Sequence, residues 1–149
     1  MKANLKFMVP LTLAGAVAST VALAEIPASG EAGASNALPE VDGPALDIGV
    51  CKAATSHAGT SKVLTCSCPA EKYNSTSVWG TDFYTADSYI CTTARHAGVI
   101  TQDGGRVVLQ MQPGLASYAG TKRNGITTRG YGKYRASYRY VRLKEKDGK

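Results

Sequence analysis

The sequence contains little that could support catalysis. It has only two histidines among 149 residues, and it lacks a glycine-rich phosphate loop, a serine-centred elbow and a clustered set of metal ligands. His57 lies in a polar stretch without a neighbouring carboxylate. His96 lies near the end of a predicted helix, where an imidazole can bond free carbonyl groups. These absences favour a non-catalytic protein without cofactor or metal; an acid–base pair of His96 with Asp82 or Asp87 is the alternative.

The chain has only one long hydrophobic run, which lies at the N-terminus. Residues 7–23 are mostly apolar, follow Lys2 and Lys6, and end in Ala22-Leu23-Ala24, whose small residues suit signal peptidase. A membrane anchor needs about 20 strongly apolar residues, whereas this run contains several Gly, Ser, Thr and Pro residues. We therefore expect residues 1–24 to be a cleaved signal peptide. The mature protein is expected to be exported, periplasmic or secreted, with no transmembrane span.

Positive charge is missing from residues 25–50, which carry five acidic residues and no Lys or Arg. Three prolines and many Ala, Gly and Ser residues accompany them, so too few apolar side chains are present to offset the ordering entropy. We predict a flexible acidic leader over residues 25–46, one folded domain over residues 47–143 and a basic tail over residues 144–149. The sequence leaves open whether the leader folds back and masks the basic C-terminal part.

Four cysteines are the expected restraint on so small a domain: Cys51, Cys66, Cys68 and Cys91. An even number of cysteines in an exported chain favours a disulfide framework. The alternative is a zinc site that also uses His57 or His96, but the spacing Cys66-Ser67-Cys68 is tighter than zinc ligands usually have. A bond between Cys66 and Cys68 would close a strained ring, so two pairings remain.

The pattern predicts a single short helix. Asp87 or Ser88 can cap its first turn, and apolar residues at near-helical spacing extend it over residues 88–97. Cys91 lies on the inward stripe of this helix. Gly98 stands where a residue in the left-handed conformation commonly ends a helix.

The remaining signals are those of strands and turns. Residues 106–111 and 136–141 are rich in β-branched and aromatic side chains, which is typical of strands. Pro113-Gly114 ends the first of them, and Asn124-Gly125 predicts a tight turn because both residues tolerate a positive φ. One helix among several strands indicates an α+β fold.

Several segments together resemble the LCCL domain family. They are residues 78–100 (VWGTDFYTADSYICTTARHAGVI), Gly104-Gly105, Arg123-Asn124-Gly125-Ile126 and the Ser-aromatic-x-aromatic ending at residues 137–140. The resemblance implies a disulfide-stapled α+β fold, with one central helix packed among antiparallel strands. It implies cysteines paired in chain order, Cys51–Cys66 and Cys68–Cys91. It also implies a binding module without enzymatic activity, and lipopolysaccharide recognition has been proposed for some members.

Basic residues are concentrated near the C-terminus, where residues 122–149 hold ten Lys and Arg side chains against two acidic ones. An extended strand places Tyr138 and Tyr140 on one face and Arg135 and Arg139 on the other. We therefore expect the tyrosines to face the core and the arginines to face solvent. A merely solvated charged face is the alternative. The predicted ligand-binding residues are the basic side chains of this part: Lys122, Arg123, Arg129, Lys133, Arg135, Arg139 and Arg142.

These features predict a module that recognises an anionic envelope ligand, either a lipopolysaccharide-type lipid or an acidic polysaccharide, because Arg suits phosphate and carboxylate groups. The alternative is a structural or protein-interaction module of the cell envelope. Salt separates the two, since anion binding weakens with ionic strength. Nucleic acid is not expected as a partner of an exported protein. Trp79, the only tryptophan, is predicted to be a core anchor, with an exposed ligand shelf as the alternative.

Overall fold

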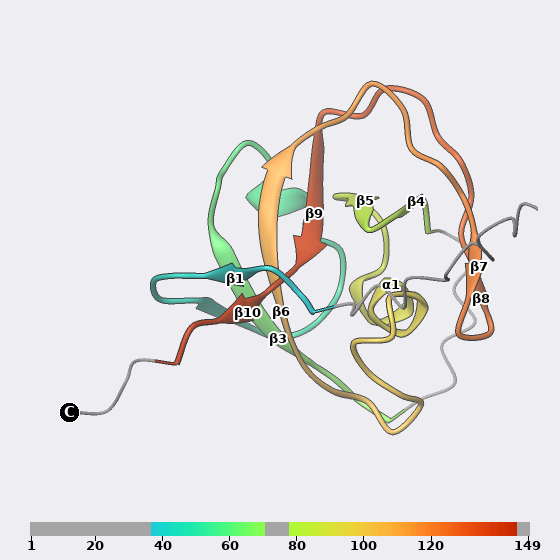
Figure 1. Ribbon diagram of the computed structural model, residues 1–149. Helices are drawn as coiled ribbons and strands as arrows, with labels where there is room; N and C mark the ends of the chain where they lie inside the picture. Colours follow the sequence, from blue (N-terminus) through green and yellow to red (C-terminus); the bar gives the residue numbers. More distant parts are fainter. Residues whose placement is uncertain (1–36, 71–77, 146–149) are drawn as a thin grey trace, which may run out of the picture. The chain divides into compact units, whose positions relative to one another are not determined.

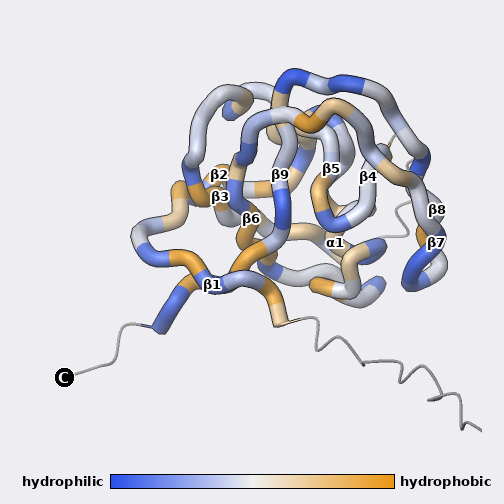
Figure 2. Tube along the Cα trace, turned by 45° about the horizontal axis from the view of Figure 1, so that its top comes forward, coloured by the Kyte–Doolittle hydropathy of each residue, from blue (hydrophilic) through white to orange (hydrophobic). Residues whose placement is uncertain are grey.

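The computed structural model describes residues 37–70 and 78–145. The predicted signal peptide, residues 25–36 of the predicted leader and residues 146–149 of the predicted tail lie outside the described residues. The strands and the α-helix, most of them labelled in Figure 1 and β2 labelled in Figure 2, are β1 (Glu40–Val41), β2 (Leu46–Val50), β3 (Val63–Cys68), β4 (Gly80–Thr81), β5 (Phe83–Thr85), α1 (Ile90–His96), β6 (Gly105–Pro113), β7 (Lys122–Arg123), β8 (Ile126–Thr127), β9 (Ala136–Tyr140) and β10 (Arg142–Leu143).

Six strands form the main sheet, in the order β2-β3-β6-β9-β5-β4. Its centre is antiparallel: Leu64 of β3 is opposite Leu109 of β6, which is in turn opposite Tyr140 of β9. Along β6, buried Val107, Leu109 and Met111 alternate with more exposed residues, as the two-residue period of a strand requires. The edge strand β2 pairs in parallel with β3, so the sheet is mixed at this edge. The α+β prediction is confirmed.

The helix α1 is shorter than predicted, and its N-terminus is satisfied in another way. It has seven residues and no side-chain cap hydrogen bond, so neither Asp87 nor Ser88 acts as the predicted cap. The Ile90 N–H donates instead to the Lys52 carbonyl at 2.9 Å. Ser88 is fully buried, and its hydroxyl accepts a hydrogen bond from the Trp79 N–H at 2.9 Å. This side chain therefore fixes the residue just before β4 rather than the helix itself.

Two tyrosines of β9 bury their rings and hydroxyl groups against α1. Tyr138 and Tyr140 are 0% and 3% exposed, and their hydroxyl oxygens lie 2.8 and 2.7 Å from Thr93 Oγ1 on the helix. The two phenols also donate to the carbonyls of Ser88 and Ile90, at 3.2 and 2.7 Å. Burial raises the pKa of both phenols, which keeps them neutral. The predicted inward orientation of these tyrosines is confirmed.

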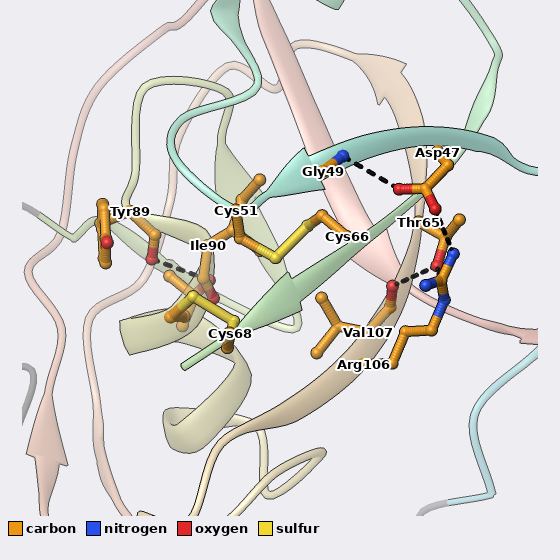
Figure 3. Close-up of a disulfide and its surroundings, with 12 residues drawn as sticks. Asp47, Gly49, Cys51, Thr65, Cys66, Cys68, Tyr89, Ile90, Arg106 and Val107 are labelled. Atoms are coloured by element: carbon orange, nitrogen blue, oxygen red, sulfur yellow. Dashed lines mark hydrogen bonds and ion pairs between the residues drawn. A yellow bond between two sulfur atoms is a disulfide. The ribbon is translucent and has the colours of Figure 1, made fainter. Parts of the chain in front are cut away.

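Two disulfides connect the sheet to the helix and to the segment after β2. Cys51 is bonded to Cys66 of β3, and Cys68 is bonded to Cys91 of α1; Figure 3 shows the surroundings of the bridges. The partners are 15 and 23 residues apart, and closing loops of that size stabilises a fold by about 3 kcal/mol each in the chain-entropy account. The pairing implied by the family resemblance is confirmed. All four thiols are used, which leaves no cysteine ligand for the zinc alternative.

Part of the predicted leader is folded onto the C-terminal end of the domain. β1 pairs in parallel with β10, and the two strands lie side by side in Figure 1. Next to this pair, Lys144 Nζ lies 2.9 Å from the Asp42 carboxylate, and Leu38 packs against the core. Residues 37–46 were predicted to be flexible, but their backbone groups gain ladder hydrogen bonds from a strand about 100 residues away in the sequence, which composition alone cannot reveal.

Candidate anion-binding site

A pocket of about 200 Å³ lies where the leader meets β5, β7, β9 and the C-terminal end of α1. Two arginines line it, Arg123 of β7 and Arg139 of β9, together with Asp82. The rest of its wall is mostly apolar and consists of Ala37, Leu38, Pro39, Phe83, Ala97 and Tyr140. We call it the arginine pocket. It offers two guanidinium groups beside apolar surface.

Arg139 is held in the pocket without a carboxylate partner. It stands between Tyr138 and Tyr140 on β9, and because these two rings are buried, its side chain lies on the opposite face of the sheet, as predicted. The guanidinium carbon lies 6.0 Å from the centre of the Phe83 ring, and Nη2 donates to Gln110 Oε1 at 3.2 Å. Nε is buried and has no hydrogen-bond partner within the described residues. None of the described ion pairs involves Arg139, so its charge is available to an anion.

Arg123 contributes the second guanidinium and makes one exposed ion pair. Its Nη1 lies 2.7 Å from Asp82 Oδ1, and the two side chains are 43% and 66% exposed. Pairs this exposed are typically worth less than about 1 kcal/mol. An anionic ligand can therefore compete with Asp82 for this arginine.

The β7–β8 hairpin that carries Arg123 is fixed against the end of α1. Its predicted Asn124-Gly125 turn is confirmed, because both residues have a positive φ, 49° and 76°. Asn124 Nδ2 donates to the His96 carbonyl at 3.0 Å, which satisfies one of the last carbonyls of the helix. Gly98 follows the helix in the left-handed conformation, with φ 74°, as predicted. Figure 2 shows that the tip of this hairpin is hydrophilic.

A second pocket adjoins the arginine pocket, since Leu38 and Ala97 line both. It adds Arg106 of β6 and the predicted ligand-binding residue Arg142 of β10. Arg106 donates to Asp47 at 2.6 Å and to Thr65 Oγ1 at 3.0 Å, contacts that Figure 3 shows. Sequence reasoning missed Arg106, although its alternation with the apolar residues of the same predicted strand places it on the solvent-facing side.

Comparison with known proteins identifies the family of this domain. The family model of the LCCL domain matches residues 46–138, which is more than half of the chain. The chain belongs to the LCCL domain family. It is 32% identical over 81 residues to human vitrin, 37% over 71 residues to human cochlin and 39% over 70 residues to human cysteine-rich secretory protein LCCL domain-containing 2. These matches cover 54%, 48% and 44% of this chain but only 12%, 12% and 14% of the relatives' own lengths.

In this LCCL domain His96 has a structural position. The ring is fully buried, and its Nε2 lies 3.3 Å from the Thr121 carbonyl and 3.1 Å from Thr121 Oγ1. Because a carbonyl only accepts, Nε2 carries the proton, and the Tyr84 hydroxyl donates to Nδ1 at 2.8 Å. Burial lowers the pKa of His96. Within the described residues neither Asp82 nor Asp87 hydrogen-bonds the ring, and its contacts join the helix to the sheet and to the segment before β7.

The other predicted ligand-binding residues lie outside the arginine pocket and its neighbour: Lys122, Arg129, Lys133 and Arg135. Arg135 precedes β9 rather than sharing its outer face with Arg139. The backbone of Arg129 forms an isolated β-bridge with that of Trp79. The Trp79 side chain is half-buried, so its burial is intermediate between that of the predicted core anchor and that of the alternative exposed shelf. Outside residues 1–36, 71–77 and 146–149, no helix is long and apolar enough to cross a membrane.

Proposed function

We propose that this LCCL domain is an exported, non-catalytic binding module for an anionic lipid of the lipopolysaccharide type. A phosphate or carboxylate of the headgroup lies between Arg123 and Arg139, and the apolar part of the lipid contacts Leu38 and Phe83. The observation that carries the proposal is the arginine pocket, in which two guanidinium groups border apolar surface. A lipid with a charged head and an apolar body matches both parts of that wall.

The charges around the two adjoining pockets favour an anion over a cation. Four arginines line them, and the carboxylates beside them, Asp82 and Asp47, are both exposed and already paired with Arg123 and Arg106. Arginine binds phosphate and carboxylate through two parallel N–H donors, and such charge-assisted hydrogen bonds are about twice as strong as neutral ones. The Nε of Arg139 is unpaired but buried, so the ligand meets the terminal nitrogens of this guanidinium group.

Several observations support an extracytoplasmic location. Two disulfides form and persist in oxidising compartments, and the N-terminal segment has the pattern of a secretory signal. The name of one relative, cysteine-rich secretory protein LCCL domain-containing 2, includes the word secretory. Together they favour a periplasmic or secreted protein that meets lipid surfaces directly.

Binding to vesicles tests the proposal. The oxidised chain of residues 25–149 is mixed with phosphatidylcholine vesicles, with and without lipopolysaccharide, across a series of salt concentrations. We expect binding only to the lipopolysaccharide-bearing vesicles, and we expect it to weaken as salt rises. R123Q together with R139Q should weaken binding by about a hundredfold, because each of the two lost charge-assisted hydrogen bonds contributes about 1.5 kcal/mol.

The matched control is K133Q with R135Q, which removes the same two positive charges outside the arginine pocket. This variant should bind the vesicles nearly as tightly as the wild type. Equal losses in both double variants would show a non-specific charge effect and contradict the proposed site. Absence of binding at low salt would contradict the proposal and would favour a protein partner instead.

A further inference from the structure

Three aromatic rings form a connected surface that shares no residue with the arginine pocket. The Trp79 and Tyr131 rings lie 6.0 Å apart at 62°, and the Tyr131 and Tyr134 rings lie 5.9 Å apart at 74°. Tyr131 is 47% exposed, which is unusual for so large a ring in contact with two others. We call these three residues the aromatic ladder. Its edge-to-face contacts leave ring faces accessible.

The backbone beneath the aromatic ladder is fixed by hydrogen bonds. Tyr131 and Tyr118 exchange both backbone N–H···O bonds, at 3.0 and 2.8 Å. The Tyr134 N–H donates to the Leu115 carbonyl at 3.2 Å, and the Trp79 N–H donates to the Ser88 hydroxyl at 2.9 Å. The exposed Tyr131 ring therefore lies on a hydrogen-bonded support beside the half-buried Trp79 and Tyr134, so little backbone entropy is lost when a ligand contacts it.

Three exposed basic side chains accompany the aromatic ladder in the same segment: Arg129, Lys133 and Arg135. None of the described ion pairs involves them. The acidic neighbour is Asp87, whose carboxylate accepts a hydrogen bond from the Tyr134 hydroxyl. Partial burial, and then the charge of this carboxylate, raise the pKa of the Tyr134 phenol, so the phenol stays neutral. Three positively charged side chains thus accompany the aromatic ladder, against the one negatively charged side chain of Asp87.

We propose that the aromatic ladder and these three basic side chains form a binding surface for an acidic polysaccharide. A pyranose ring presents a face of C–H groups, which packs on an exposed aromatic ring such as that of Tyr131. The carboxylates of successive uronic acid units meet the Lys and Arg side chains, which explains why basic residues accompany aromatic ones in one segment. This surface is independent of the proposed lipid site, since the two share no residue.

Oligogalacturonate of about ten units is a suitable probe, and its methyl ester is the control because it keeps the rings and lacks the charges. Titration calorimetry of the oxidised 25–149 protein should show binding of the acid at low salt and much weaker binding of the ester. Tyr131→Ala should weaken binding of the acid about tenfold, whereas Tyr131→Phe should retain it because the ring face is unchanged. K133Q with R135Q should weaken binding and flatten its salt dependence.

Two further measurements separate this surface from the lipid site and from a folding defect. R123Q with R139Q should leave oligogalacturonate binding unchanged, and Tyr131→Ala should still unfold cooperatively above the assay temperature and leave vesicle binding unchanged. Binding of the acid that is as tight in Tyr131→Ala as in the wild type would overturn the proposal. Absence of binding to oligogalacturonate, or tighter binding to a single-stranded DNA oligonucleotide, would overturn the assignment to a polysaccharide.

Discussion

Two neighbouring threonines of α1 should respond in opposite ways to the same substitution. Thr92 and Thr93 are both buried, at 1% and 0% exposure. Thr93 Oγ1 contacts the Ile90 carbonyl and the hydroxyls of Tyr138 and Tyr140 within 2.9 Å. Thr92 Oγ1 has no hydrogen-bond partner in the part of the chain that the structure describes. Replacing either hydroxyl by a methyl group, as Thr→Val does, therefore tests this network directly.

The magnitudes follow from the hydrogen bonds. Thr93 has a single hydroxyl proton and both phenols donate to carbonyls, so Thr93 can donate to only one of the two tyrosine hydroxyls. Thr93→Val therefore removes one buried hydrogen bond, at about 1 kcal/mol. In Thr92→Val a buried hydroxyl without a partner is removed, so the free energy of unfolding should stay the same or rise by up to about 1 kcal/mol. Thr and Val have similar helix propensities, so that contribution cancels.

Thermal and urea unfolding of the oxidised variants measure the difference. A loss of about 1 kcal/mol lowers the melting temperature of a domain of this size by roughly 4 °C or more, and Thr92→Val should melt at or above the wild-type temperature. Equal destabilisation in the two variants would show that the hydrogen bonds of Thr93 do not stabilise the fold. A loss below about 0.5 kcal/mol in Thr93→Val would do so as well, since surface substitutions already reach that value.

Two other predictions concern a close backbone contact and a buried imidazole. A Cβ on Gly114 would lie 1.7 Å from the Tyr134 carbonyl oxygen, whereas a Cβ on Gly132 would meet nothing within 4 Å. Gly114→Ala should therefore cost more than about 3 kcal/mol in urea unfolding or prevent folding, and a cost as small as that of Gly132→Ala would contradict this. Because the pKa of His96 is lowered in the fold, the unfolded chain binds a proton first, so stability should fall as pH drops below about 6.5 and level off below the folded pKa. His96→Gln should remove this limb of the stability profile, and an unchanged profile would show that other groups produce it.

Patterns within one element predicted much of this fold. The alternation along residues 136–141 placed Tyr138 and Tyr140 inside and Arg139 outside, because side chains of a strand point to opposite faces. The Asn124-Gly125 turn and the left-handed Gly98 followed from conformations that few other residues adopt. The disulfide pairing came from the family resemblance, since spacing alone left two pairings.

Contacts between distant elements could not be predicted in the same way. Ser88 is of a residue type that commonly caps helices, but its hydroxyl accepts a hydrogen bond from the Trp79 N–H, nine residues before it in the sequence. Arg135 and Arg139 were expected to form one stripe, yet β9 begins at Ala136, and of the two arginines only Arg139 lines the arginine pocket. A run of basic residues shows how much charge is present, but the path of the backbone decides which of those charges meet. For the same reason the contribution of Leu38 to the arginine pocket was not expected.

Binding of an anionic lipid in the arginine pocket can be tested residue by residue in one titration. Amide ¹H–¹⁵N spectra of the oxidised 25–149 protein are recorded while dihexanoyl phosphatidic acid, a soluble lipid with a phosphate headgroup, is added below its micelle concentration. If the lipid binds in the arginine pocket, the amide chemical-shift changes should saturate and should be largest at Leu38, Phe83, Ala97, Arg123 and Arg139. Shifts confined to the aromatic ladder, or spread evenly over every exposed basic residue, would contradict it.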